Sequence, residues 1–246
     1  MALPGPLHQP TGVLRTPRPT LRYLVFGRVL PGVIYTILGL IILRQTVASY
    51  QNLSGAGLFG IAAGPVRWTL YLLFVSLPVG VYLTRPMPQA RDSSLVAWSA
   101  ALIGTTLLLF TGAFAPVGQL ILAVPNWIVD LSDLMLAAAT ALGVWGLLLL
   151  RNSFSIVPEA RRVVRGGPYR FIRHPLYSSE ILVSVALLIA AGPSPYGLHL
   201  VATCSVLVFI AVQMWRIRLE EQLLTRVFPE YAEYATTTSR LFPFIW

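Results

Sequence analysis

Long apolar runs are the feature that most restricts how this 246-residue chain can fold. A helix needs about 17–25 mostly apolar residues to cross the hydrocarbon core of a bilayer, and several runs approach or reach that length. Hydrophobic residues make up 56% of the chain and charged residues only 11%, against roughly 25% charged residues in a soluble domain. We therefore predict an all-α integral membrane protein with about six transmembrane helices. The expected spans are 23–43, 67–85, 95–115, 134–150, 178–192 and 198–215.

One further apolar stretch, 117–129, is too short to cross a bilayer comfortably and contains Pro125 and Asn126. We interpret it as an interfacial or re-entrant segment, or as an extension of the fourth helix. The chain then divides into two parts. Residues 1–129 form an N-terminal transmembrane part with three spans and this segment, and residues 130–246 form a core that carries the polar motifs.

The positions of the arginines predict how the spans are oriented. All 18 basic residues are arginine, and basic residues concentrate in cytoplasmic loops. With six spans and both termini in the cytoplasm, only Arg44 and Arg67 would lie on the opposite side. This bias, together with attraction to anionic lipids, accounts for the net charge of +9. Nucleic acid is therefore not an expected partner.

Polar residues are concentrated in two segments that leave the membrane on the same side. The first, 158–180, follows the fourth span, and its Gly166-Gly167-Pro168 sequence cannot continue a helix. Pro175 then suits the first turn of the next helix, whose free N–H groups favour an anion. The second, 216–244, begins as an amphipathic helix and continues into an aromatic tail. We expect the two segments to meet as a polar pocket at the level of the lipid headgroups.

Each polar group also has a plainer interpretation. Arg161, Arg162 and Arg165 could belong to a basic loop that faces lipid, and a histidine at a helix start is often only a cap. Tyr169 and Tyr177 could be interfacial aromatics. Glu220 and Glu221 could pair with Arg216 and Arg218 or face solvent. The order and spacing of the motifs, taken together, argue against these interpretations.

The motifs are Gly167-Pro168-Tyr169-Arg170, then Arg173-His174-Pro175-Leu176-Tyr177, then Glu220-Glu221 and Phe228-Pro229-Glu230-Tyr231. In this order they resemble the isoprenylcysteine carboxyl methyltransferase family and its wider superfamily, which includes phospholipid N-methyltransferases. The resemblance covers about residues 130 to 244. It implies a membrane enzyme that holds S-adenosylmethionine (SAM) at the cytoplasmic side. Two positions depart from the family pattern, with Arg161 in place of a frequent histidine and Ser179 in place of a common glycine.

The resemblance also implies the roles of individual residues. Arg173 or Arg170 would bind a carboxylate bidentately, and Glu221 or Glu220 would bind the SAM ammonium group or act as a base toward an amine acceptor. We predict Arg173 and Glu221 as the catalytic residues. The predicted cofactor-binding residues are Val164, Gly167, Pro168, Tyr169, Arg173, His174, Pro175, Tyr177, Glu220 and Glu221. No metal site is expected, because the chain has one cysteine and three histidines that lie far apart in sequence.

Three functions are compatible with the sequence. The first is a SAM-dependent methyltransferase acting on the carboxylate of a prenylcysteine-like lipophilic acceptor. The second is an N-methyltransferase for a phospholipid or another lipophilic amine. The third, from a different class, is a non-catalytic membrane scaffold or transporter. The expected partners are the lipophilic acceptor and membrane lipids, and the sequence leaves the oligomeric state open.

Overall fold

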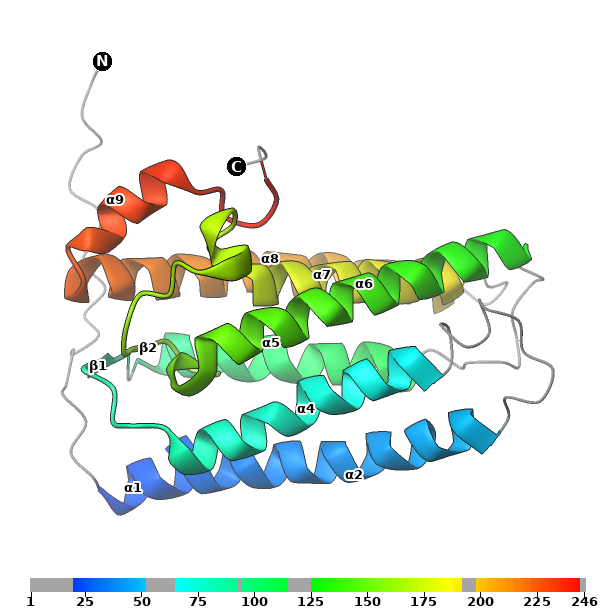
Figure 1. The fold of residues 1–246 in the computed structure, drawn as a ribbon, viewed down its shortest axis with the longest axis horizontal. Helices are drawn as coiled ribbons and strands as arrows, with labels where there is room; N and C mark the ends of the chain where they lie inside the picture. The colour runs from blue at the N-terminus through cyan, green and yellow to red at the C-terminus, as the bar shows by residue number, and fades with distance from the viewer. Residues whose placement is uncertain (1–19, 52–64, 93, 115–124, 192–197, 244–246) are drawn as a thin grey trace.

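The computed structural model describes residues 20–51, 65–92, 94–114, 125–191 and 198–243. Its helices run side by side along one axis as an elongated bundle (Figure 1). The long helices are α2 (Leu30–Gln51), α4 (Arg67–Thr84), α5 (Leu95–Phe114), α6 (Asn126–Leu150), α7 (Pro175–Ala191) and α8 (Leu198–Val227). The shorter elements are α1 (Leu21–Leu24), η1 (Val25–Val29), β1 (Ala90–Arg91), η3 (Arg151–Ser153), β2 (Glu159–Ala160), η4 (Gly167–Arg170) and α9 (Glu230–Thr237).

The six long helices lie at the positions of the predicted spans. Three of them are long and apolar enough to cross a bilayer, over Val25–Ala48, Asp130–Ser153 and His199–Val227. The other three contain shorter apolar segments, at Trp68–Thr84, Leu95–Thr105 and Pro175–Ile189. The chain is thus a mainly helical membrane protein, while the count of six spans and the orientation of the termini stay predictions, as does the division at residue 129.

The structure describes only the last residues, 125–129, of the stretch 117–129. Residues 126–129 belong to the first turns of α6, which agrees with an extension of the fourth helix. Residues 117–124, and with them the interfacial or re-entrant alternative, lie outside the described residues. Pro125 stands directly before the helix, where its missing N–H breaks no hydrogen bond.

Small residues allow the helices of the core part to pack closely, as is usual between membrane helices. The Ser132 hydroxyl on α6 donates a 2.7 Å hydrogen bond to the Ala186 carbonyl on α7. Further along, a Cβ at Gly143 would lie 2.5 Å from Ser179 Oγ and 2.9 Å from the Phe74 ring. Ser179, the residue that departs from the family's common glycine, therefore fits because the facing position on α6 has no side chain.

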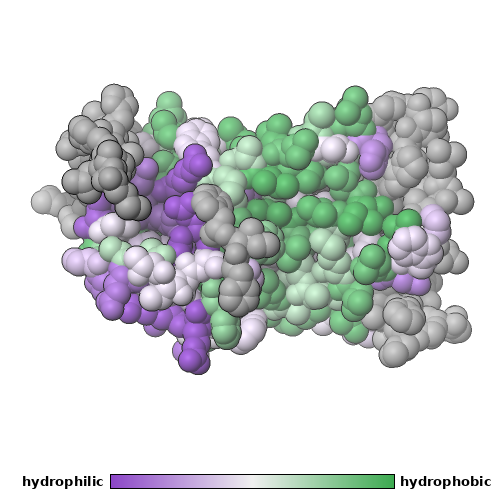
Figure 2. Space-filling view, turned by 90° about the horizontal axis from the view of Figure 1, so that it is seen from above, coloured by the Kyte–Doolittle hydropathy of each residue, from purple (hydrophilic) through white to green (hydrophobic). Residues whose placement is uncertain are grey.

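The polar residues gather at one end of the bundle. Figure 2 shows a broad apolar band beside a hydrophilic end, and Figure 1 places β1, β2 and α9 at that end. Helix α8 has 30 residues, about 45 Å of helix, which exceeds the ~30 Å hydrocarbon core. Its C-terminal part, from Arg216 onward, therefore extends beyond the apolar band and carries the Glu220-Glu221 pair to the polar end.

The turn of η4 depends on Gly167 in two ways. Its φ is +56°, in the left-handed region that residues with a Cβ rarely adopt. A Cβ there would also lie 2.3 Å from Leu149 Cδ1 on α6. The neighbouring Gly166 has φ −93°, and no atom lies within 4 Å of its hypothetical Cβ. Gly167 therefore fixes the loop against α6, and Gly166 does not.

We predict that Gly167→Ala destabilises the protein by about 1–3 kcal/mol, because it adds both backbone strain and overlap with Leu149. Thermal unfolding in detergent measures the change as a lower Tm. Gly166→Ala is the matched control and is expected to change the Tm little. Equal effects at both positions would contradict this account of the turn.

Candidate functional site

The two polar segments meet through backbone hydrogen bonds, as the sequence predicted. The amides of Arg173 and His174 donate to the carbonyls of Ser239 and Arg240, at 2.8 and 3.0 Å. The buried Ser178 hydroxyl adds a 2.6 Å bond to the Leu241 carbonyl. The loop before α7 and the tail after α9 are therefore joined into one unit, and α8 passes beneath it.

Glu221 on α8 is the centre of this unit. Its Oε1 accepts a 2.8 Å hydrogen bond from Arg173 Nε and lies 3.2 Å from His174 Nε2. Its Oε2 accepts a 2.8 Å bond from Arg240 Nε. The side chains of Arg173, His174 and Glu221 are 8%, 4% and 12% exposed, so little solvent weakens these contacts. One carboxylate thus holds groups from the loop and from the tail.

The surroundings of Glu221 keep its carboxylate ionised. Burial alone raises the pKa of a carboxyl group. Here the hydrogen bonds and charges of His174 and Arg173 outweigh burial and lower the Glu221 pKa from 4.5 to about 2. A carboxylate with such a low pKa binds protons poorly, so the arrangement suits charge pairing better than general-base catalysis.

Arg173 also binds the tail directly. One of its terminal nitrogens, Nη1, donates to the carbonyls of Ala235, at 2.7 Å, and of Thr238. With the bond from Nε to Glu221, three of its five N–H groups are used. The other terminal nitrogen, Nη2, makes no hydrogen bond within the described part of the chain. It is the group through which Arg173 can contact a ligand.

Glu220 lies on the adjacent position of α8 and has a different environment. Its Oε2 accepts a 2.9 Å hydrogen bond from the Tyr177 hydroxyl. The guanidinium of Arg216 lies over the Tyr177 ring, 5.2 Å from its centre, and donates a 2.9 Å bond to Gln213. Gln213 in turn donates to Glu180. The tyrosine connects Glu220 to a polar network that runs into the helices.

The remaining predicted cofactor residues are mostly packed into the protein. Tyr169 is buried, and its hydroxyl donates to the Gly146 carbonyl at 3.4 Å. Burial, and then the charge of Glu220, raises the Tyr169 pKa well above 10, so this hydroxyl stays a donor. Pro168 and Pro175 are buried as well, and Val164 is half-buried. Of the predicted set, Arg173, His174, Tyr177, Glu220 and Glu221 form the polar cluster, while Val164, Gly167, Pro168, Tyr169 and Pro175 lie around it.

Sequence reasoning missed Arg240, Gln213 and Glu180. Arg240 completes the contacts to Glu221, yet in the sequence it is an isolated arginine in an aromatic tail. Gln213 and Glu180 lie inside predicted spans, and a polar residue within a span was the available signal for both. Neither Glu220 nor Glu221 forms an ion pair with Arg216 or Arg218, the partners considered above. Tyr177 contacts Glu220, and Arg173, His174 and Arg240 contact Glu221.

The alternative of a lipid-facing loop is wrong for Arg161. Its Nη2 lies 2.6 Å from Oε2 of the buried Glu159, and its Nε donates to the Pro86 carbonyl. Arg85 and Arg91 also pair with Glu159, at 3.3 and 3.4 Å. The antiparallel pairing of β1 with β2 brings these charged residues together, because it places Arg91 opposite Glu159. A short strand pair so far apart in sequence was not predictable from composition.

Arg162 and Arg165 behave differently from Arg161. Both are exposed. Arg162 Nε donates a 3.1 Å bond to the Ser153 hydroxyl. Arg165 donates to the Glu230 carbonyl at 2.8 Å and lies 5.5 Å from the centre of the Tyr234 ring. Arg165 therefore links the loop to α9, whereas Arg162 stays at the surface beside η3.

Comparison with known proteins identifies the part of the chain that carries this site. Residues 115–231 match the phospholipid methyltransferase family. That family is part of the isoprenylcysteine carboxyl methyltransferase and phospholipid methyltransferase superfamily. The matched segment includes the loop, Glu220 and Glu221 and ends at the start of α9, so it contains most of the polar cluster.

Two curated proteins are similar over a shorter region. The cobalt-zinc-cadmium resistance protein CzcN of Cupriavidus metallidurans is 37% identical over 81 residues, 33% of this chain and 35% of that protein. The nickel-cobalt-cadmium resistance protein NccN of Alcaligenes xylosoxydans xylosoxydans is 36% identical over 85 residues, 35% of this chain and 38% of that protein. The chain thus matches little more than a third of the length of these relatives. Among the described residues, no three His, Cys, Asp or Glu side chains gather as metal ligands would.

We predict that Glu221→Gln loosens the contact between the loop and the tail. The substitution leaves Arg173 and Arg240 without their shared anion, and loss of a buried partner of this kind costs about 3–5 kcal/mol, less here because Arg240 is partly exposed. Hydrogen exchange at the amides of Arg173 and His174 should become faster. Glu233→Gln, at an exposed position on α9, is the control and should leave both amides protected. Unchanged exchange in Glu221→Gln would show that the backbone contacts hold without it.

Proposed function

We propose that this protein is a SAM-dependent membrane methyltransferase whose site is the polar cluster around Glu221. The observation that carries the proposal is the Glu221 carboxylate, which gathers Arg173, His174 and Arg240 from two separate segments within a superfamily of methyltransferases. A scaffold would need no such convergence of charged groups at little solvent exposure. Perturbed titratable groups of this kind concentrate at functional sites.

The residues present fit the chemical groups of SAM, which supplies an electrophilic methyl group on a sulfonium when bound. The Arg173 nitrogen Nη2 suits the carboxylate of the cofactor. Glu220 has one carboxylate oxygen engaged by Tyr177 and the other, Oε1, available for an ammonium group or ribose hydroxyls. The open space beside Gly166 lets a ligand approach the loop backbone. Glu221, with both oxygens occupied, acts as a positioning residue that holds Arg173 and His174 in place.

The electrostatics favour a carboxylate as the methyl acceptor. A carboxylate is already ionised near neutral pH and requires no base, whereas an ammonium group must first lose a proton. Glu221 is ill suited to remove that proton, because its pKa is about 2. Arginine residues in the loop would instead orient an anion. The favoured acceptor is therefore a lipophilic molecule with a free carboxylate, of the prenylcysteine type.

Methyl transfer to such an acceptor requires no covalent intermediate with the protein. The reaction is an in-line displacement, so its rate depends on holding donor and acceptor at near-attack distance and excluding water. Glu221 lies near the C-terminal end of α8, and Figure 2 shows a hydrophilic end next to the apolar band. A lipophilic acceptor can approach from the membrane while SAM enters from the aqueous side, which we propose to be the cytoplasm.

A second candidate is an N-methyltransferase acting on a phospholipid or another lipophilic amine. The description of the matching family as phospholipid methyltransferases favours it. Glu220 would then be the base, since Tyr177 donates a hydrogen bond to it and, among the described residues, no arginine forms an ion pair with it. The two candidates predict different dependence of the rate on pH.

We predict that SAM or S-adenosylhomocysteine raises the Tm of the purified protein in detergent, because a ligand that binds the folded state stabilises it. NADPH is expected to have no effect. For Arg173→Lys, the ligand concentration that gives the same rise in Tm should be at least tenfold higher, since lysine cannot reproduce the geometry of the guanidinium. Arg162→Lys, at the surface, is the matched control and should stay within a few-fold of the wild type. A protein stabilised by NADPH and not by millimolar SAM would refute the proposed cofactor.

We predict methyl transfer to a small farnesylated cysteine analogue with a free carboxylate, and loss of activity when that carboxylate is amidated. Between pH 7 and pH 9 the rate should change little, because the acceptor is ionised throughout. Incorporation of labelled methyl groups measures both the preference for the free carboxylate and the dependence of the rate on pH. A rate that rises steeply over this range, with label recovered in an ethanolamine headgroup, would support the amine candidate instead.

A further inference from the structure

One buried tyrosine hydroxyl at the polar end has no hydrogen-bond partner within the described part of the chain. Tyr231, at the start of α9, is 3% exposed, and its Oη is buried without a hydrogen bond to any described residue. An unpaired buried donor costs stability, and nearly all buried polar groups in proteins are paired. The hydroxyl therefore requires a partner that the described residues do not supply.

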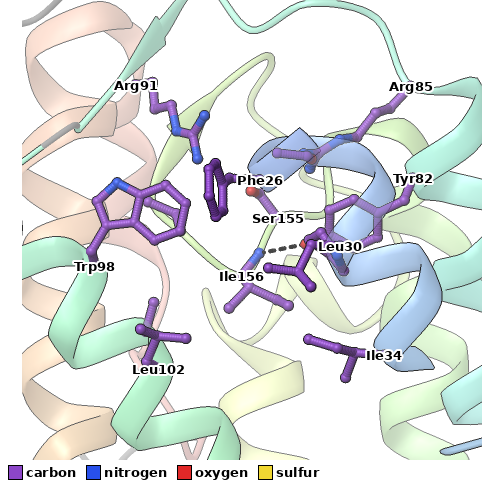
Figure 3. Close-up of a pocket in the computed structure, with 14 residues that line it drawn as sticks. Phe26, Leu30, Ile34, Tyr82, Arg85, Arg91, Trp98, Leu102, Ser155 and Ile156 are labelled. Atoms are coloured by element: carbon purple, nitrogen blue, oxygen red, sulfur yellow. Dashed lines mark hydrogen bonds between the residues drawn. The ribbon is translucent and has the colours of Figure 1, made fainter. Parts of the chain in front are cut away.

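Other buried tyrosines have partners within the protein. Figure 3 shows one of them in the pocket between η1, α2, α4 and α5, where the Tyr82 hydroxyl accepts a 3.0 Å hydrogen bond from the Ile156 amide. On α9 itself, the Tyr234 hydroxyl donates to the Tyr169 carbonyl. The rings of Tyr231 and Tyr234 lie 5.7 Å apart. The two tyrosines thus share one short helix and differ in whether the hydroxyl is paired.

The charged groups that act on the Tyr231 hydroxyl are those of the polar cluster. Its ring belongs to the same apolar cluster as Leu223 on α8, about one helical turn beyond Glu220. Burial, and then the charges of Glu221 and Glu220, raise the pKa of Tyr231 above 10, while Arg173 acts in the opposite direction. The hydroxyl stays protonated around neutral pH and can donate a hydrogen bond.

The hydroxyl lies near two carboxylates and bonds to neither. Both oxygens of Glu221 are engaged by arginines, and Glu220 Oε2 accepts from Tyr177. The groups left without a hydrogen bond among the described residues are Nη2 of Arg173 and Oε1 of Glu220. These are the groups proposed above to hold the carboxylate and the ammonium group of the cofactor. A carboxylate has two oxygens, so it can accept from the arginine and from the tyrosine hydroxyl at once.

We propose that Tyr231 is a cofactor-binding residue whose hydroxyl donates a hydrogen bond to the carboxylate of SAM, next to Arg173. The inference rests on the proposed function, and it adds α9 to the cofactor site as a third segment beside the loop and α8. Arg173 already holds the C-terminal end of α9 through the carbonyls of Ala235 and Thr238. The two donors therefore belong to one unit before a ligand binds.

The test removes a single hydroxyl from the full-length protein in detergent. Tyr231→Phe is compared with the wild type and with Tyr234→Phe, the matched control, whose hydroxyl is paired within the protein. The ligands are SAM and decarboxylated SAM, which lacks only the carboxylate and keeps the sulfonium, the ammonium group and the adenosine. The Tm is measured without ligand, and isothermal titration calorimetry gives the Kd of each ligand.

The two variants should change the Tm in different directions when no ligand is present. We expect Tyr231→Phe to unfold at or above the wild-type Tm, because the substitution removes an unpaired buried hydroxyl. Tyr234→Phe should unfold below it, because the Tyr169 carbonyl loses its donor. A lower Tm for Tyr231→Phe would show that its hydroxyl has a partner within the protein, and would overturn the proposal.

The ligands should separate the two tyrosines in the opposite way. Tyr231→Phe should bind SAM about tenfold more weakly, as expected for a lost hydrogen bond to a charged group, and bind decarboxylated SAM like the wild type. Tyr234→Phe should bind both ligands like the wild type. Unchanged SAM affinity in Tyr231→Phe would overturn the proposal and leave the proposed function intact, and an equal loss for both ligands would overturn the contact with the carboxylate. A wild-type protein that binds neither ligand would refute the proposed function, and this inference with it.

Discussion

The polar end of this protein depends on one carboxylate placed among cations. Glu221 accepts hydrogen bonds from Arg173 and Arg240 and lies within 3.2 Å of His174. These groups come from a loop, a helix and a tail, and of the contacts between these segments Glu221 makes those that join all three. Hydrophobic burial stabilises the bundle, but it is not directional. Charge-assisted hydrogen bonds with fixed geometry determine how the loop and tail are positioned relative to α8.

A second carboxylate, Glu159, does the same for the N-terminal helices. It collects Arg85 from the end of α4, Arg91 from β1 and Arg161 from the loop. Each of the two glutamates thus joins segments distant in sequence, and Arg216 links the two regions through Ile156 and Tyr177. A chain with few charges concentrates them at two junctions, where each one contacts several elements.

The sequence predicted the helices well because their apolar runs are long and follow directly from the length needed to cross a bilayer. It also predicted that the loop and the C-terminal segment meet, since both leave the same end of adjacent spans. It did not predict how they meet. The participation of Arg240 and the burial of Arg161 depend on tertiary contacts over many residues, and neither has a local pattern in the sequence. The ion pair between Arg91 and Glu159 depends on the β1–β2 pairing, which is only two residues long.

The facing pair Gly143 and Ser179 has a consequence for sequence comparison. The serine hydroxyl occupies the volume that a Cβ on Gly143 would fill, at a distance of 2.5 Å. The space between α6 and α7 at this point therefore holds a side chain from one of the two positions but not from both. In a homologue with glycine at the position of Ser179, alanine opposite it would lose the overlap with the hydroxyl and would meet only the Phe74 ring, at 2.9 Å, whereas serine at one position requires glycine at the other. Covariation between these two sites would thus report the distance between two helices, independently of the chemistry performed at their ends.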